Sequence, residues 1–311
     1  MKQNFKPMLN PDDLIKKLKT LGIRFNIINE EKAKRILNDK TYYFKLGYFR
    51  TNFPKKNNRY NIEFAYLSDL ASIDMNLRYL LMKMCLDIEH IIKTIIIHNI
   101  SIDNTEDGYT IMNDFYNSEE QKARTFRNVM KNETIKENGK ITKRKVPKKE
   151  FKKYYDNPPV WVCLELMSYN QFNEFVHFYQ NRFNNPDFKL IVNCIDNVRK
   201  TRNHCAHNQP LLVNLNNPKL NSTKQYMMNK ATNQFGISYS QIKLLPVRNV
   251  SSVFLLHSNY CHSDTQNDLK GYLNDFQVQL NANKSYYSNN KHLNRTLSAI
   301  NKIIDEYKSQ C

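Results

Sequence analysis

The segment Ile195–Leu212 carries the residue types best suited to chemistry. It reads IDNVRKTRNHCAHNQPLL and places four residues between Arg202 and His207. On an ideal α-helix Asn203 and His207 share a face, whereas Arg202 lies ~140° around the helix from His207. Arg202 and His207 therefore converge only if the helix end bends or a second copy of the motif faces the first. Pro210 disfavours helix at the residue before it, so the helix is predicted to end within a turn of His207.

An imidazole at that position, next to a permanent cation, suits the cleavage of RNA. The negative end of the helix dipole favours a protonated imidazole, which can change charge near neutral pH. RNA supplies its own nucleophile, the 2′-hydroxyl, so the protein needs only to move protons and to stabilise negative charge at phosphorus. We therefore predict that His207 transfers protons, that Arg202 stabilises charge, and that Asn203 completes the catalytic set.

A metal site at the same place is the alternative for these residues. His204, Cys205 and His207 are close in sequence, and Cys261 and His262 could complete a ligand set. The chain has no C-x-x-C pair and no regular ligand spacing, which zinc sites usually show. We predict no metal and no cofactor.

The charge of the chain favours a polyanionic partner. Lys and Arg number 47 against 29 Asp and Glu, so the formal net charge is 47 − 29 = +18. Such self-repulsion is offset by binding a polyanion, although net charge alone does not separate RNA from DNA or anionic lipid. The stretch Lys131–Lys153 is predicted to be a loop or a small hairpin, and either it contacts phosphates or it is a solvated surface. Its candidate RNA-binding residues are Lys143, Arg144, Lys145, Lys148 and Lys149.

A second candidate RNA-binding region, Tyr42–Tyr60, interleaves aromatic and basic residues. Such a mixture can stack on bases and pair with phosphates. The alternative, slightly favoured, is a short helix that packs Phe44, Tyr48 and Phe49 into a core. The basic candidates here are Lys45, Arg50, Lys55 and Lys56.

Scarce turn residues predict an all-α fold to position these side chains. The chain has only 6 Gly and 10 Pro, whereas β-rich folds need many turns. Apolar spacing and capping residues predict helices over residues 12–21, 30–37, 68–100, 187–207, 240–256 and 292–307, with a further helix after Pro159. After Pro210 the chain is expected to be irregular until about Gln234, and Pro246 interrupts the helix that follows.

Two helices carry residues of special interest. The helix over 68–100 holds Glu89 and Lys93 four residues apart among isoleucines. They are either an ordinary surface ion pair or a polar pair, with Glu89 orienting Arg202 or His207. In the helix after Pro159 the predicted core residues are Trp161, Leu164, Met167, Phe172, Phe175 and Phe178.

The chain shows no export signal and no membrane span. The residues MKQNFKPMLNPDD lack an apolar core, and no apolar run reaches the ~20 residues that cross a bilayer. The 6 cysteines are scattered, which fits a reducing compartment. We expect a cytoplasmic protein without membrane contact.

Four blocks of the sequence resemble one family. RNHCAHNQPL is similar to the R-N-x-x-x-H motif of the HEPN superfamily, and the wider pattern resembles the Abi/AbiD/AbiF-type abortive infection proteins. YYFKLGYFR is similar to their tyrosine-rich block, and LRYLLMKMCLDIEHIIK to their long helix, with Glu89 at the acidic position. PPVWVCLELMSYNQF matches P-x-W-x-x-x-E-x-x-S at Trp161, Glu165 and Ser168. The likeness covers about Pro11 to Leu212.

The resemblance implies an all-helical HEPN-type bundle with N-terminal and C-terminal helical additions. The expected regions are 1–65, a helical core over 66–212 with a basic insertion at about 131–153, and 213–311. It implies a metal-independent endoribonuclease toxin in phage defence, with a site completed by pairing two motifs in a homodimer or higher homo-oligomer. It also implies restraint by a structured small RNA.

One departure from the family bears on the partner. Some HEPN toxins carry a tyrosine soon after the histidine, which a nucleotidyltransferase modifies. Here Asn208, Gln209 and Pro210 follow instead, which disfavours that kind of partner. The remaining alternative is a non-catalytic RNA-binding scaffold, in which Arg202 and His207 only hold RNA or stabilise a helix end.

Overall fold

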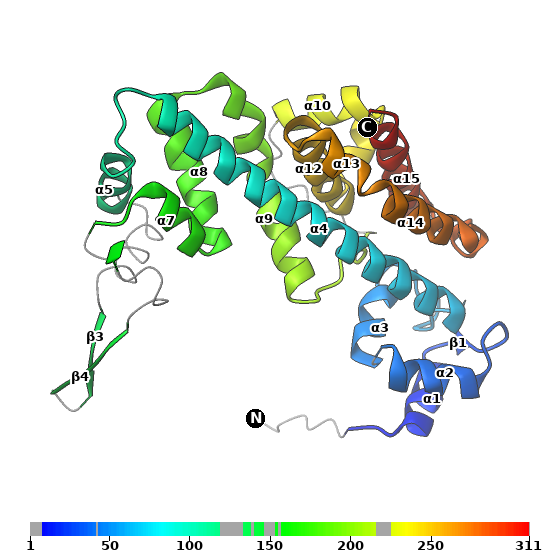
Figure 1. Cartoon of the computed structure of the whole chain (residues 1–311). Helices are drawn as coiled ribbons and strands as arrows, with labels where there is room; N and C mark the ends of the chain where they lie inside the picture. The colour runs from blue at the N-terminus through cyan, green and yellow to red at the C-terminus, as the bar shows by residue number, and fades with distance from the viewer. Residues whose placement is uncertain are drawn as a thin grey trace.

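The computed structural model describes residues 8–41, 43–118, 133–137, 140–145, 153–154, 157–215 and 225–310. Within these ranges helices make up nearly all regular structure, and strands occur only in two short pairs. The prediction of an all-α fold is confirmed (Figure 1).

Local signals account for the N-terminal helices. Helix α1, Pro11–Thr20, begins where the Asn10 side chain accepts a hydrogen bond from the amide of Asp13 at 2.9 Å, and proline occupies its first position. Helix α2, Glu30–Asp39, is capped in the same way by Asn29. Helix α3, Tyr43–Arg50, follows, and strands β1, Ile23–Arg24, and β2, Ile62–Glu63, pair in parallel.

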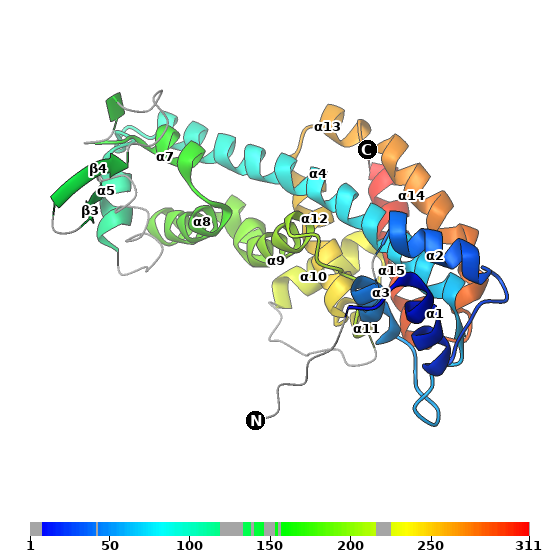
Figure 2. The same cartoon turned by 90° about the horizontal axis from the view of Figure 1, so that it is seen from below.

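Helix α4, Phe64–Ile102, is the central helix of the fold and has 39 residues. Helices α1–α3 lie at one end of α4, and α5, Thr110–Asn117, lies at the other together with strands β3, Glu133–Glu137, and β4, Lys140–Lys145 (Figure 2). The antiparallel β3–β4 pair confirms the hairpin expected in the basic stretch.

The motif helix packs across the middle of α4. Helix α7, Val160–Leu166, and helix α8, Tyr169–Phe183, lead through the short 3₁₀ turn η2, Pro186–Phe188, into helix α9, Lys189–Ala206. The predicted helix over 187–207 is confirmed, except that its first turn is 3₁₀.

Trp161 corrects one prediction about the core. Its side chain is 42% exposed, whereas Leu164, Met167, Phe172 and Phe175 are buried and Phe178 is partly buried. Trp161 lies on the outer side of the short helix α7, where its ring covers Gly108 and meets Tyr109 edge-on at 5.7 Å. The inner side of α7 is occupied by smaller apolar residues.

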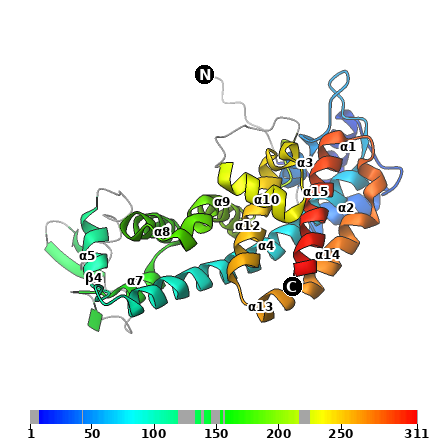
Figure 3. The same ribbon diagram turned by 90° about the horizontal axis from the view of Figure 1, so that it is seen from above.

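The C-terminal helices gather around the half of α4 nearest α1–α3 (Figure 3). They are α10, Gln225–Phe235; α11, Tyr239–Ile242; α12, Leu245–Tyr260; α13, Ser263–Asn267; α14, Lys270–Ala282; and α15, Lys291–Gln310, with the 3₁₀ turn η3, Lys284–Tyr287, between the last two. Helix α12 contacts both α4 and α9, and its residues from Pro246 to His257 are all buried. An all-round buried helix is a central one.

One detail of this region differs from the sequence-based expectation, and another agrees with it. Residues 225–235, expected to be irregular, form α10, which buries Met227, Ala231 and Phe235 at helical spacing. The helical stretch predicted over 240–256 is interrupted near Pro246, as expected: α11 ends at Ile242, and Pro246 stands in the first turn of α12, where its fixed φ and missing N–H are tolerated. No helix among the described residues is long and apolar enough to cross a bilayer. The division into regions at 65 and 212 stays a prediction.

Candidate functional site

The end of α9 is fixed by a Schellman motif. His207 is the C-cap, and Asn208 follows it in the left-handed conformation with φ 56°. The amide of Asn208 donates to the carbonyl of Cys205 at 3.1 Å, and the amide of Gln209 donates to the carbonyl of His204 at 2.8 Å. These are the two bonds that define this helix ending, in which Asn is the usual substitute for Gly. The prediction that the helix ends within a turn of His207 is confirmed.

A buried ion pair on α4 anchors this helix ending. Arg78 and Asp74 are both buried, and the Arg78 Nε donates to an Asp74 oxygen at 2.8 Å. The other Asp74 oxygen accepts the amides of Leu211 and Leu212 at 2.7 and 2.8 Å. Arg78 also donates to the side-chain oxygen of Asn208. This network ties α4 to the backbone on the C-terminal side of His207.

A second set of bonds ties α3 to the same segment. The buried side chain of Asn52, just beyond α3, donates to the carbonyl of Leu212 at 2.7 Å and accepts the amide of Leu215 at 3.0 Å. The hydroxyl of Thr51 accepts the amide of Asn214 at 3.2 Å. The chain after the motif is therefore held between α3 and α4, and α3 lies next to the C-terminal end of α9.

Arg202 lies four residues, just over one turn, before the last residue of α9 and faces α8. Its guanidinium lies over the ring of Tyr169, 5.4 Å from the centroid. Tyr169 is the first residue of α8, whose start is set by a capping box between Ser168 and Gln171. In the described part of the chain Arg202 makes no ion pair, and neither its Nε nor the Tyr169 hydroxyl, both buried atoms, has a hydrogen-bond partner. Arg202 is therefore a half-buried cation that no carboxylate of the described residues neutralises directly.

Glu89 and Lys93 pair with each other at 3.0 Å, and both side chains are mostly buried. The Lys93 ammonium also lies 5.7 Å from the centroid of the Phe172 ring. Glu89 and Arg202 both lie near the Tyr169 hydroxyl. Burial raises the pKa of Tyr169 well above its usual value, the charge of Glu89 raises that pKa further, and the charge of Arg202 lowers it. Glu89 therefore belongs to the same cluster as Arg202. No hydrogen bond or ion pair joins Glu89 to Arg202 or His207 among the described residues, so its orienting role stays a prediction.

Burial makes the thiols in this cluster less acidic than an ordinary cysteine. Burial raises the pKa of Cys85 well above its usual value, and burial raises the pKa of Cys205 to about 12. Both sulfurs stay protonated at neutral pH, and a thiol is a weak nucleophile and a weak metal ligand. In the described ranges, no three His, Cys, Asp or Glu side chains come close enough to hold a metal ion.

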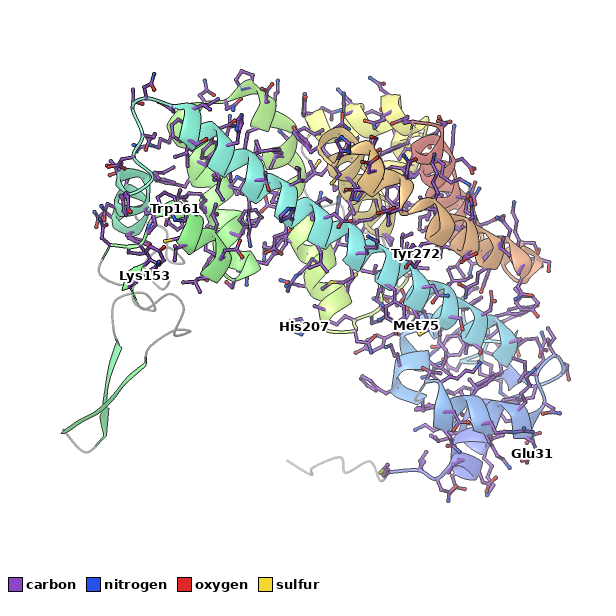
Figure 4. The ribbon with its side chains drawn as sticks, viewed as in Figure 1. Glu31, Met75, Lys153, Trp161, His207 and Tyr272 are labelled. Atoms are coloured by element: carbon purple, nitrogen blue, oxygen red, sulfur yellow. The ribbon has the colours of Figure 1, made fainter. Side chains whose placement is uncertain are left out.

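His207 is separate from this cluster. Figure 4 shows it at the very end of α9, and its side chain is exposed. Asn203, one turn earlier, is partly buried, and its carbonyl accepts the amide of His207 at 3.0 Å. No hydrogen bond joins Arg202 to His207 within the described residues. One chain therefore presents the two predicted catalytic side chains near the same end of α9 but apart from each other and in different surroundings.

The basic residues predicted to bind RNA have several environments. Arg50 is half-buried against the rings of Tyr43 and Tyr60, and Lys55 lies 5.1 Å from the Tyr60 centroid. Lys56 is exposed in a tight turn. Burial, and next the positive charge of Arg78, lower the pKa of Lys45, so Lys45 lies close to the network at the end of α9. Lys143, Arg144 and Lys145 are on β4, whereas Lys148 and Lys149 lie outside the described residues.

Sequence reasoning missed three residues that position the site, namely Asp74, Arg78 and Tyr169. Asp74 and Arg78 stand four apart on α4, the same spacing as Glu89 and Lys93. That spacing could have raised them as candidates, but nothing in it distinguishes a buried pair from an exposed one.

Comparison with known proteins gives one match. The model of a family described as Abi-like protein matches residues 35–213, which run from α2 to the segment just after the motif. No curated protein and no solved structure matches the chain.

Proposed function

Because this chain belongs to the Abi-like protein family, and so to the abortive infection proteins, we propose that it is a metal-independent endoribonuclease toxin acting through Arg202 and His207. The observation that carries the proposal is the position of the Arg202 guanidinium and its lack of a counter-charge among the described residues. A permanent cation is held over Tyr169, with no ion pair among the described residues, on the helix that ends at an exposed imidazole. The pentacoordinate transition state of phosphodiester cleavage carries extra negative charge on its non-bridging oxygens, which such a cation stabilises.

The proposed reaction follows from these two groups. The 2′-oxygen of the substrate attacks the adjacent phosphorus, and the bond from phosphorus to the 5′-oxygen breaks. An imidazole removes the proton from the 2′-hydroxyl or delivers one to the leaving 5′-oxygen, while Arg202 stabilises the charge on the non-bridging oxygens. The products are a 2′,3′-cyclic phosphate and a 5′-hydroxyl.

Pairing of two chains supplies a second His207 imidazole for the reaction. Two proton transfers occur in this reaction, whereas one motif supplies one His207. The other exposed imidazole at the end of α9, His204, is not part of the R-N-x-x-x-H pattern. A two-fold contact between α9 ends would place two imidazoles and two guanidinium groups around one phosphate. We therefore propose a homodimer as the active form, in line with the resemblance to HEPN proteins.

The high positive charge supports RNA as the ligand of the resting protein as well. With a net charge of +18, the protein is expected to hold a structured small RNA that restrains it until infection. Binding of that kind rests on many phosphate contacts and weakens as salt rises.

Substitution of the two motif residues tests the proposal. Arg202→Ala and His207→Ala should each reduce RNA cleavage by ~10²–10⁴-fold and relieve toxicity in cells, while RNA affinity changes little. The matched controls are Lys200→Ala, an exposed cation on the same helix, and His98→Ala, a histidine near the end of α4 and far from the motif. Both controls should cleave like the wild type.

The same experiment separates the enzyme from the scaffold. Full cleavage by His207→Ala would show that the motif is not catalytic. Purified wild-type protein that binds RNA but leaves it intact under all conditions that relieve restraint would favour the non-catalytic scaffold. In mixed dimers, one His207→Ala chain should impair cleavage more than dilution alone.

A further inference from the structure

Two large aromatic side chains on α3 are exposed next to the motif. Phe44 is 67% exposed and Tyr48 is 40% exposed, and their rings meet edge-on with centroids 5.3 Å apart. They stand four residues apart, so they share one face of α3, opposite the face that buries Leu46 and Phe49. The alternative in which Phe44 and Tyr48 pack into the core is wrong, and only Phe49 does so.

The position of this face is fixed relative to the end of α9. Asn52 and Thr51, directly after α3, bond the backbone at Leu212, Asn214 and Leu215. Lys45, next to Phe44, lies close enough to Arg78 for the two charges to interact, and Arg78 bonds Asn208 beside His207. Views from two directions show α3 beside the end of α9 (Figures 1 and 2).

The chemistry of this surface suits one kind of ligand. Two adjacent rings on a surface rich in cations offer π-faces and edges for stacking, and the neighbouring positive charge attracts a phosphate backbone. A base within a duplex already stacks on its neighbours and has no free face. An unpaired base has one, and proteins recognise RNA mainly in such single-stranded segments.

We propose that Phe44 and Tyr48 form a base-stacking platform, and that the RNA taken to the end of α9 is unpaired where it crosses α3. This inference rests on the proposed function in taking RNA as the ligand, and it adds the substrate class. A duplex can contact the cations of the protein but not this platform.

The test compares a single-stranded RNA with a duplex of the same sequence. Binding is measured by fluorescence anisotropy with the full-length His207→Ala protein, so that cleavage does not interfere. Adding Phe44→Leu and Tyr48→Leu should weaken single-strand binding about 5- to 150-fold, equivalent to the ~1–3 kcal/mol that stacking of one base contributes. Duplex binding should change less than about twofold.

Two matched controls keep the test interpretable. Phe44→Tyr with Tyr48→Phe retains both rings and should retain single-strand affinity. Tyr79→Leu with Tyr272→Leu removes two tyrosines of similar exposure, 64% and 62%, from the groove of about 550 Å³ between α4 and α14. That change should leave both affinities unaltered. Circular dichroism confirms that each variant is folded.

Each outcome decides the inference separately from the proposed function. Unchanged single-strand affinity in the leucine variant would overturn the platform, as would an equal loss for single strand and duplex. If the wild type does not cleave RNA but the selective loss occurs, the nuclease proposal fails and the platform stands. If the wild type cleaves RNA but the leucine variant binds single-stranded RNA normally, the nuclease proposal stands and the platform fails.

Discussion

Replacing Asp74 with alanine should destabilise the protein more than any change at an exposed charge. Asp74 is 0% exposed and Arg78 is 2% exposed, and Asp74 accepts three hydrogen bonds, from Arg78 and from the amides of Leu211 and Leu212. Its removal leaves a buried guanidinium without its counter-charge, and breaking a buried pair in this way typically costs ~3–5 kcal/mol. That is a large share of the ~5–15 kcal/mol stability of an ordinary domain.

The stability lost in Asp74→Ala has two parts, one from the stranded charge of Arg78 and one from the unpaired amides of Leu211 and Leu212. The double variant Asp74→Leu with Arg78→Met removes both charges, so that no charge is left buried and the amides of Leu211 and Leu212 and the side chain of Asn208 lose their partners. It should be more stable than Asp74→Ala by ~2 kcal/mol or more, because an uncompensated buried charge costs more than an unpaired amide. Neither variant should cleave RNA normally, since the backbone at Leu211 and Leu212 is no longer bonded to α4.

Urea unfolding followed by circular dichroism at 222 nm measures both variants. Glu31→Ala, which removes an exposed partner of Lys34, is the control and should unfold at almost the wild-type urea concentration. A loss below ~1 kcal/mol for Asp74→Ala would refute the reasoning, because it would mean that Arg78 is hydrated and not buried. A double variant no more stable than Asp74→Ala would refute the assignment of the loss to the stranded charge.

Other perturbations have equally definite outcomes. Replacing Lys143, Arg144 and Lys145 together with alanine should reduce the slope of log affinity against log salt by about 2, because each phosphate of single-stranded RNA that a cation neutralises adds ~0.7 to that slope, and an unchanged slope would show that β4 does not bind RNA. Burial raises the pKa of Asp87, but the hydrogen bond with His257 and the charge of Lys83 lower it to below the ordinary value of 3.8. The ionised Asp87 carboxylate therefore stabilises the folded protein above pH 3.8, and this stabilisation disappears as the pH falls through the lowered pKa. Asp87→Asn should therefore melt below the wild type at pH 7 in calorimetry, with the difference shrinking below pH 3.8; a constant difference would contradict this. Cleavage should persist in excess EDTA, and its loss with recovery on adding a divalent ion would overturn the metal-free mechanism.

Short-range information in the sequence determined most of the helices. Asn10 with Pro11 marks the start of α1, and Pro210 with the apolar spacing before it marks the end of α9. Such signals work because capping and helix breaking depend on a few neighbouring residues. The motif with Arg202 and His207 was visible for the same reason. The helix α10 also had a readable spacing, but its Asn- and Gln-rich composition obscured it.

Tertiary structure alone decided which of these residues are buried and which are exposed. Asp74–Arg78 and Glu89–Lys93 have the same spacing on α4. Of these two pairs, only Asp74–Arg78 is covered by the segment after α9, whose amides at Leu211 and Leu212 donate hydrogen bonds to Asp74.

Trp161 and Phe44 have the residue type of core positions and are exposed, because the apolar space beneath each is filled by neighbours on the same helix. Burial depends on the chain segments that pack from far along the sequence, and a local pattern carries no information about them. For this reason the sequence alone determined most of the helices and the motif, whereas packing decided what surrounds Arg202 and what anchors the backbone after His207.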